Sequence, residues 1–150
     1  MSVVSEPDRF GVLLRGGARG VVAAMAMTGM RTVSSGLGLL KQAPPEEVAT
    51  EGLPCLFSRI PAENRDEVIE LAHWLYGAGA GAVFGMLPAP IRRHAWAGPA
   101  YGIAIWLAFE AGIAPLLGLR ERELDASDRL MVAADHVLYG LVLGARPRRV

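Results

Sequence analysis

Five ionisable residues lie inside or at the edge of apolar stretches of this sequence: Arg31, His73, Glu110, Asp135 and His136. A charged side chain in an apolar surrounding costs about 2.5 to 3.5 kcal/mol. Because buried charges are generally paired, one interpretation is an ion pair between Arg31 and Glu110 with both histidines hydrogen-bonded nearby. In this interpretation, the polar cluster fixes how the helices align.

A second interpretation gives the same residues a function. Carboxyl and imidazole groups held away from water can change protonation near neutral pH, so Glu110, His73 and His136 would form a proton-responsive or ion-binding site. Two imidazoles and a carboxylate could also hold zinc or iron. No helix carries two such ligands at the i, i+4 spacing, and we therefore expect neither a metal nor a cofactor.

Composition favours a membrane protein. Hydrophobic residues make up 52% of the 150 residues and charged residues 20%. Most acidic residues fall in Glu46–Glu70 and Glu121–Asp128, so the apolar stretches between them are nearly free of charge. The formal net charge of zero argues against a nucleic-acid partner. A single cysteine, Cys55, excludes an internal disulfide.

Four apolar stretches predict an all-α fold, an integral membrane bundle of four transmembrane helices in a single domain (1–150). The spans cover about residues 16–40, 68–87, 97–119 and 130–145. About 20 apolar residues suffice to cross a bilayer, and the fourth span is the shortest. Pro88 and Pro90 end the second span and Pro99 opens the third, which predicts a tight helical hairpin there.

Basic residues predict the orientation. Eight of them precede span one, lie between spans two and three, or end the chain: Arg9, Arg15, Arg19, Arg92, Arg93, Arg146, Arg148 and Arg149. The other two connections hold six: Lys41, Arg59, Arg65, Arg120, Arg122 and Arg129. Since cytoplasmic loops are enriched in basic residues, we expect both termini in the cytoplasm. A cleaved signal peptide ending near Ala26 is an alternative, but the hydrophobic stretch before it is short.

Small residues recur every fourth position in all four spans. Such faces let helix backbones approach closely in lipid. They comprise Gly16, Gly20, Ala24 and Thr28 in span one, Gly77, Gly81 and Gly85 in span two, Gly98 and Gly102 in span three, and Gly140 and Gly144 in span four. The pattern predicts a compact bundle.

One motif occurs twice, and we call it the His-Tyr-Gly motif. Its residues are His73, Tyr76, Gly77 and Gly81 in span two, and His136, Tyr139, Gly140 and Gly144 in span four. If spans one and three also correspond, the protein consists of two helical hairpins in a parallel repeat about an axis along the membrane normal. A chance match is the alternative, because short motifs recur at random.

Aromatic residues have a plainer explanation. Trp74, Tyr76, Trp96 and Tyr101 fall near predicted helix ends, where aromatic side chains commonly lie at the membrane interface. No serine, histidine and acid arrangement is apparent, and no pair of carboxylates has a catalytic context. We therefore expect no catalytic residue and no enzymatic activity.

The segment from His73 to Gly144 resembles a known family. It contains His73-x-x-Tyr76-Gly77, then Gly98-x-x-Tyr101-Gly102-x-x-x-Trp106-x-x-x-Glu110-x-x-x-x-Pro115-x-x-Gly118, then His136-x-x-Tyr139-Gly140. This pattern is similar to the YagU-like family of small bacterial inner-membrane proteins. The resemblance implies a location in the bacterial cytoplasmic membrane but no mechanism, because the activity of that family is not established. Span one and residues 41–65 match less clearly.

Two functional hypotheses follow. In the favoured one, the protein is a structural or interaction module whose small-residue faces bind a membrane partner or another copy, so Glu110→Gln mainly lowers stability or assembly. In the other, it is a small transport or proton-responsive protein, so Glu110→Gln leaves folding intact and removes a pH-dependent flux. A membrane enzyme and a soluble helical bundle are further alternatives.

Overall fold

A computed structural model describes residues 8–38, 48–119 and 126–145, which hold helices and connections but no strand. Within this part of the chain, the predicted all-α class is confirmed. In chain order the elements are α1 (Arg9–Gly36), the π-helical turn η1 (Val48–Gly52), α3 (Pro54–Phe57), the 3₁₀ turn η2 (Ala62–Asn64), α4 (Arg65–Met86), α5 (Ala89–Arg92), α6 (Ala97–Ala108), the π-helical turn η3 (Phe109–Ile113), α7 (Ala114–Leu116) and α8 (Ala126–Gly144).

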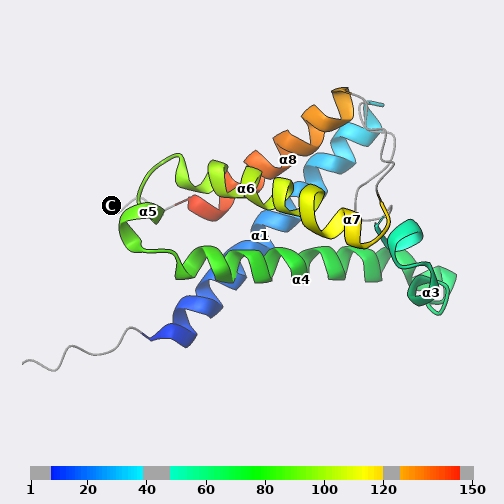
Figure 1. Cartoon of the computed structure of the whole chain (residues 1–150), viewed down its shortest axis with the longest axis horizontal. Helices are drawn as coiled ribbons and strands as arrows, with labels where there is room; N and C mark the ends of the chain where they lie inside the picture. Colours follow the sequence, from blue (N-terminus) through cyan, green and yellow to red (C-terminus); the bar gives the residue numbers. More distant parts are fainter. Residues whose placement is uncertain (1–7, 39–47, 120–125, 146–150) are drawn as a thin grey trace, which may run out of the picture.

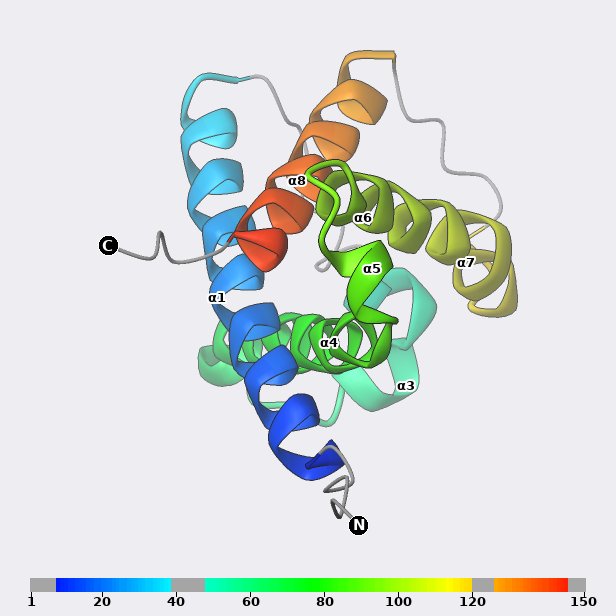
Figure 2. The same cartoon turned by 90° about the vertical axis from the view of Figure 1, so that its left-hand side faces the viewer.

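The long helices form two layers that cross each other. In Figures 1 and 2, α1 and α8 run antiparallel in one layer, and α4 and α6 run antiparallel in the other. The start of α1, the short helix α5 and the end of α8 lie toward the left of Figure 1, whereas α3 and α7 lie at the right. Arg15 and Arg19 of α1 and Arg92 of α5 line one small pocket. Arginines far apart in the sequence thus gather around this pocket.

Three helices begin earlier than the hydropathy pattern predicts, and α4 starts at Arg65 instead of residue 68. α1 starts at Arg9 instead of residue 16, because the Asp8 side chain caps it by accepting a 3.0 Å hydrogen bond from the Gly11 amide. α8 starts at Ala126 instead of residue 130. Hydropathy marks the apolar residues, whereas a helix continues through polar ones until its hydrogen-bond ladder ends. The predicted end of span one, residues 39–40, lies outside the described residues.

The third predicted span is helical to Leu116 but irregular. The π-helical turn η3 interrupts it between α6 and α7 and ends two residues before Pro115. Proline has no amide hydrogen, and its ring collides with the carbonyl of the residue four positions earlier. The wider π turn removes that conflict without breaking the helix. It also sets the position of Glu110, which lies within η3.

Glycine backbones meet where α1 crosses α4. A Cβ atom on Gly81 would lie 2.7 Å from the Cα of Gly20, and one on Gly20 would collide with the Gly77 carbonyl oxygen. Gly16 and Gly85 belong to the same contact. We call these five residues the first crossing. Only residues without a Cβ atom allow the two backbones to approach this closely.

A second crossing joins α6 to α8. A Cβ atom on Gly140 would lie 2.8 Å from the Cα of Pro99, and one on Gly98 would collide with the Gly140 carbonyl oxygen. Gly102 packs against the same part of α8, and Gly144 faces Gly98. Although α5 joins α4 closely to α6, α4 packs chiefly against α1, and α6 against α8. The second and third predicted spans are therefore joined by a short connection, as expected, but each of them packs mainly against another helix.

Two tyrosines connect α4 to the other pair of helices. The Tyr139 hydroxyl donates a 2.7 Å hydrogen bond to the Gly77 carbonyl, and the Tyr101 hydroxyl donates one of 2.7 Å to the Ala80 carbonyl. The Tyr101 ring also packs against Phe84, with centroids 5.1 Å apart. The Tyr101 side chain therefore lies between helices.

Two of the described helical stretches are long and apolar enough to cross a membrane, namely α1 and Ala97–Leu116. The helices α4 and α8 do not reach that level, since glycine, histidine and acidic residues lower their mean hydropathy. Even so, all four helices expose large apolar side chains: Leu14 and Val22 on α1, Leu75 and Val83 on α4, Leu107 on α6, and Leu130 and Leu141 on α8.

Candidate polar site and cavity

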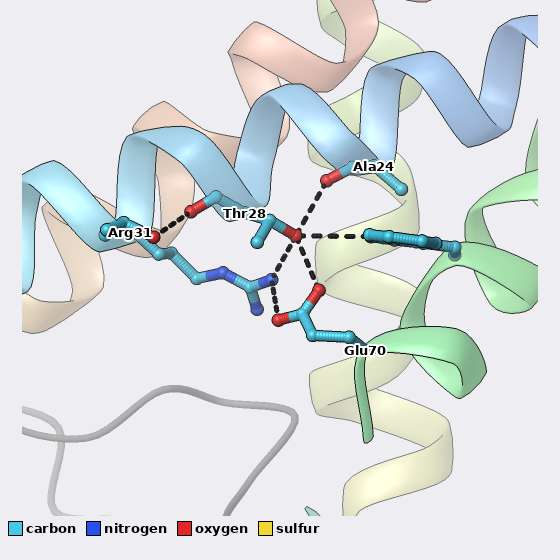
Figure 3. Close-up of polar contacts among 6 residues, drawn as sticks. Ala24, Thr28, Arg31 and Glu70 are labelled. Carbon is cyan, nitrogen blue, oxygen red and sulfur yellow. Dashed lines mark hydrogen bonds and ion pairs between the residues drawn. The ribbon is translucent and has the colours of Figure 1, made fainter. Parts of the chain in front are cut away.

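The buried charge of Arg31 is paired across the first two long helices. Arg31 on α1 is 6% exposed, and its Nη2 lies 3.6 Å from Oε1 of Glu70 on α4 (Figure 3). The expected ion pair with Glu110 is therefore wrong. Because the first crossing holds α4 directly against α1, Glu70 reaches the guanidinium, whereas Glu110 lies in η3 of the other helix pair.

Thr28 lies at the centre of this pair, one helical turn before Arg31. Its hydroxyl donates to Oε2 of Glu70 at 2.8 Å and accepts from Nη2 of Arg31 at 3.1 Å. It is also 3.3 Å from the Ala24 carbonyl, and Nε1 of Trp74 approaches it at 3.4 Å. Figure 3 shows these groups converging on one oxygen atom. Such a network restricts how α1 and α4 can slide along each other.

Asp135 adds a second carboxylate from α8. It is 5% exposed and interacts electrostatically with Arg31. The guanidinium therefore faces acidic groups from two different helices. The sequence pattern singles out Asp135 without indicating its partner, and it does not single out Glu70. The available signal for Glu70 was its position three residues before His73, which places both side chains on one face of α4.

Both histidines line the same cavity as Arg31 and Asp135 and interact with each other electrostatically. Nδ1 of His136 is 2.8 Å from the Val132 carbonyl, one turn earlier on α8. Nε2 of His73 is buried without a hydrogen-bond partner among the described residues. The structure thus brings together four of the five ionisable residues singled out from the sequence, Arg31, His73, Asp135 and His136.

Glu110 is the residue that stands apart. It does not line the cavity, and its Oε1 accepts a 3.3 Å hydrogen bond from Nε1 of Trp106, one turn earlier. Its carboxylate interacts electrostatically with His136. The ring centroids of Trp106 and His136 are 6.4 Å apart. Glu110 therefore belongs to the surroundings of His136 and not to those of Arg31.

The cavity has a volume of about 350 Å³ and mostly apolar walls. Apolar side chains from η1, α3, α4, η3 and α8 line it. Arg65 connects the α3 wall to α4, because its Nε donates to the Ile60 carbonyl at 3.2 Å and its guanidinium lies 4.9 Å from the Phe57 ring centroid. The connection between the first two long helices, which no predicted span included, thus completes the cavity.

In the described residues, no three histidine, cysteine or acidic side chains are placed to hold a metal ion. Comparison with family models, with curated proteins and with solved structures finds no match. The resemblance to the YagU-like family therefore stays a prediction.

Proposed function

We propose that this chain is a multi-pass protein of the bacterial cytoplasmic (inner) membrane, in which α1, α4, the stretch Ala97–Leu116 and α8 each cross the bilayer. The observation that supports it is the distribution of side-chain size. Glycine backbones meet inside the bundle, whereas Leu75, Leu107 and Leu141 are 63%, 54% and 53% exposed. Lipid accommodates such an apolar exterior, and close backbone packing is how helices associate there.

One acidic residue of α4 and one of α8 fit this proposal. Glu70 and Asp135 lower the hydropathy of their helices, but both interact with Arg31 inside the bundle. Ionisable residues within membrane spans generally face the interior of a bundle and pair there. The arginines gathered near the start of α1 and at α5 support an orientation with both termini in the cytoplasm.

As its role, we propose a non-enzymatic structural or interaction module of the kind the YagU-like resemblance implies, which binds a membrane partner or a second copy. The polar network supports a structural role, because Thr28, Arg31 and Glu70 join two helices that the first crossing already holds together. In this proposal, the buried charges set the alignment of the bundle that a partner recognises.

Labelling with a membrane-impermeant maleimide tests the topology. Cys55 is exposed on α3, in the connection assigned to the outer face, so intact spheroplasts should label it. The matched variant carries Cys55→Ser and Ala95→Cys, which moves the thiol to the exposed connection after α5. It should react only after the membrane is opened. Release of the protein by alkaline carbonate, or labelling with the opposite sidedness, would contradict the proposal.

A second candidate, a proton-responsive transport protein, is supported by the four ionisable side chains that line one cavity: Arg31, His73, Asp135 and His136. Proton flux into proteoliposomes between about pH 5 and pH 8, where histidine titrates, tests it. Flux that disappears in folded Asp135→Asn and Glu110→Gln variants would support transport. Flux no greater than in empty liposomes would exclude proton conduction.

A further inference from the structure

The size and walls of the cavity suit a small apolar molecule. Its volume of about 350 Å³ lies at the lower end of the range of about 300 to 1,000 Å³ for ligand pockets. Leu53, Leu56 and Phe57 cover one side, and Phe109 and Ile113 approach from η3. A chain of methylene groups would replace water along these walls, which is favourable in proportion to the apolar area covered.

The charges in the cavity compensate one another. Arg31 faces both Glu70 and Asp135, so it offers no uncompensated positive charge to an anionic head group. The Asp135 carboxylate in turn faces the guanidinium of Arg31, so it offers a cationic head group little attraction. A charged ligand would lose its hydration on entry and gain no free counter-charge from these residues. The charge arrangement therefore favours an uncharged ligand.

The one buried side-chain atom without a partner among the described residues is Nε2 of His73. The backbone of Ala24 interacts with the imidazole. Because Nε2 has no partner, we assign this interaction to an Nδ1–H group. In a neutral imidazole whose Nδ1 donates, Nε2 is an acceptor. A buried acceptor without a donor costs free energy, which a ligand hydroxyl would recover.

We propose that the cavity binds a neutral lipid-like alcohol, an apolar chain that ends in one hydroxyl group, and that this hydroxyl donates a hydrogen bond to Nε2 of His73. The apolar chain lies against the walls formed by α3 and η3. The site is separate from the proposed scaffolding role, because a ligand can occupy the cavity whether or not a partner covers the outer faces of the bundle.

Photo-labelling of the native protein in nanodiscs tests the proposal. The probe is decanol with a diazirine at the end of its chain, and the competitors share that chain: decanol, decyl methyl ether, decane, decanoate and decyltrimethylammonium. We expect saturable labelling of peptides from α3 and η3. Decanol should compete about 5-fold better than the ether or decane, since only decanol can donate a hydrogen bond.

Variants locate the hydroxyl. His73→Phe keeps a ring of similar size but removes the acceptor, so decanol should lose its roughly 5-fold advantage over the ether. His94→Phe is the matched control, because His94 lies outside the cavity, stacked on Trp96. Ala72→Trp fills the cavity and should abolish saturable labelling. If His73→Phe does not fold, the comparison of alcohol with ether on the native protein decides alone.

Three results would overturn the proposal. Labelling that does not saturate and spreads over outward side chains such as Leu75 and Leu107 would mean contact with bulk lipid only. Equal competition by decanol, ether and decane would remove the hydroxyl from the site. Stronger competition by decanoate or by decyltrimethylammonium than by decanol would show that a charged head group is preferred.

Discussion

The two copies of the His-Tyr-Gly motif share their spacing but not their surroundings. On α4, Gly77 and Gly81 face α1 in the first crossing, and on α8, Gly140 faces α6 in the second. Their tyrosines differ: Tyr76 is 46% exposed, whereas Tyr139 is 3% exposed and donates to the Gly77 carbonyl. A hydroxyl of the second copy thus binds the backbone of the first.

The histidines differ as well. His73 interacts with the backbone of Ala24 on α1, and its Nε2 is buried without a partner in the described part of the chain. Nδ1 of His136 instead lies 2.8 Å from the Val132 carbonyl on its own helix. A glycine acts through its backbone, so the same spacing produces the same crossing twice. A histidine or tyrosine acts through whatever its neighbours offer, and the neighbours of α4 and α8 are different. The repeat therefore marks where helices cross but does not assign equal roles to its polar residues.

The largest loss of stability is expected when the glycine that follows the tyrosine is replaced in either copy. Gly77→Val and Gly140→Val should each lower the free energy of unfolding by about 3 kcal/mol, because the new side chains would meet Ala24 and the backbone of Pro99. Unfolding in mixed micelles with increasing dodecyl sulfate measures this. Gly79→Val is the control, since no atom lies within 4 Å of a Cβ there. A similar loss in the control would show that helix propensity, not the crossing, is responsible.

The second-largest effect is expected for the ion pair between Arg31 and Glu70, beside the first copy. Arg31→Leu leaves Glu70 and Asp135 without their shared counter-charge and should lower the free energy of unfolding by about 2 kcal/mol. That is below the cost for a fully buried pair, because the Glu70 side chain is 35% exposed. Combining Arg31→Leu with Glu70→Leu should restore part of the loss in the same titration. A double variant as unstable as the sum of the two single ones would argue against the pair.

The tyrosines test the asymmetry of the copies directly. Tyr139→Phe should lower the free energy of unfolding by about 1 kcal/mol, because it removes the buried hydrogen bond from the hydroxyl to the Gly77 carbonyl. Tyr76→Phe should change it by less than about 0.5 kcal/mol, as expected for a half-exposed side chain. Equal effects in the two variants would mean that the copies are equivalent after all.

An effect smaller than that of Tyr139→Phe is expected for Glu110, which lies beside the second copy. Glu110→Gln keeps an oxygen that can accept from Trp106 and changes no residue that lines the cavity. We expect the free energy of unfolding to fall by less than about 1 kcal/mol, well below the effect of Arg31→Leu. The thermal unfolding midpoints of the two variants provide the comparison. A larger loss in Glu110→Gln than in Arg31→Leu would reverse the assignment of the structural ion pair.

Sequence reasoning was most informative where the physics is local. The fourfold spacing of glycine concerns one helix at a time, so positions such as Gly20 and Gly98 could be singled out without knowing their partners. The partner of Arg31 could not be predicted, because it depends on which helix lies beside α1. In the structure this partner is Glu70. The cavity could not be predicted from the sequence either, because α3, which forms one of its walls, belongs to a connection without hydrophobic periodicity.

Disulfide trapping in native membranes tests the central claim, that glycines hold α4 against α1, most directly. A Cβ atom on Gly85 would meet no atom of α1 closer than 3.1 Å, so a cysteine fits there, and it would lie 3.6 Å from Cγ1 of Val12, within reach of a disulfide. In a Cys55→Ser background, Val12→Cys combined with Gly85→Cys should form a disulfide rapidly under mild oxidation. Val12→Cys combined with Gly79→Cys should not, because Gly79 faces away from every described neighbour. Equal trapping of both pairs, or of neither, would contradict the crossing of α1 and α4.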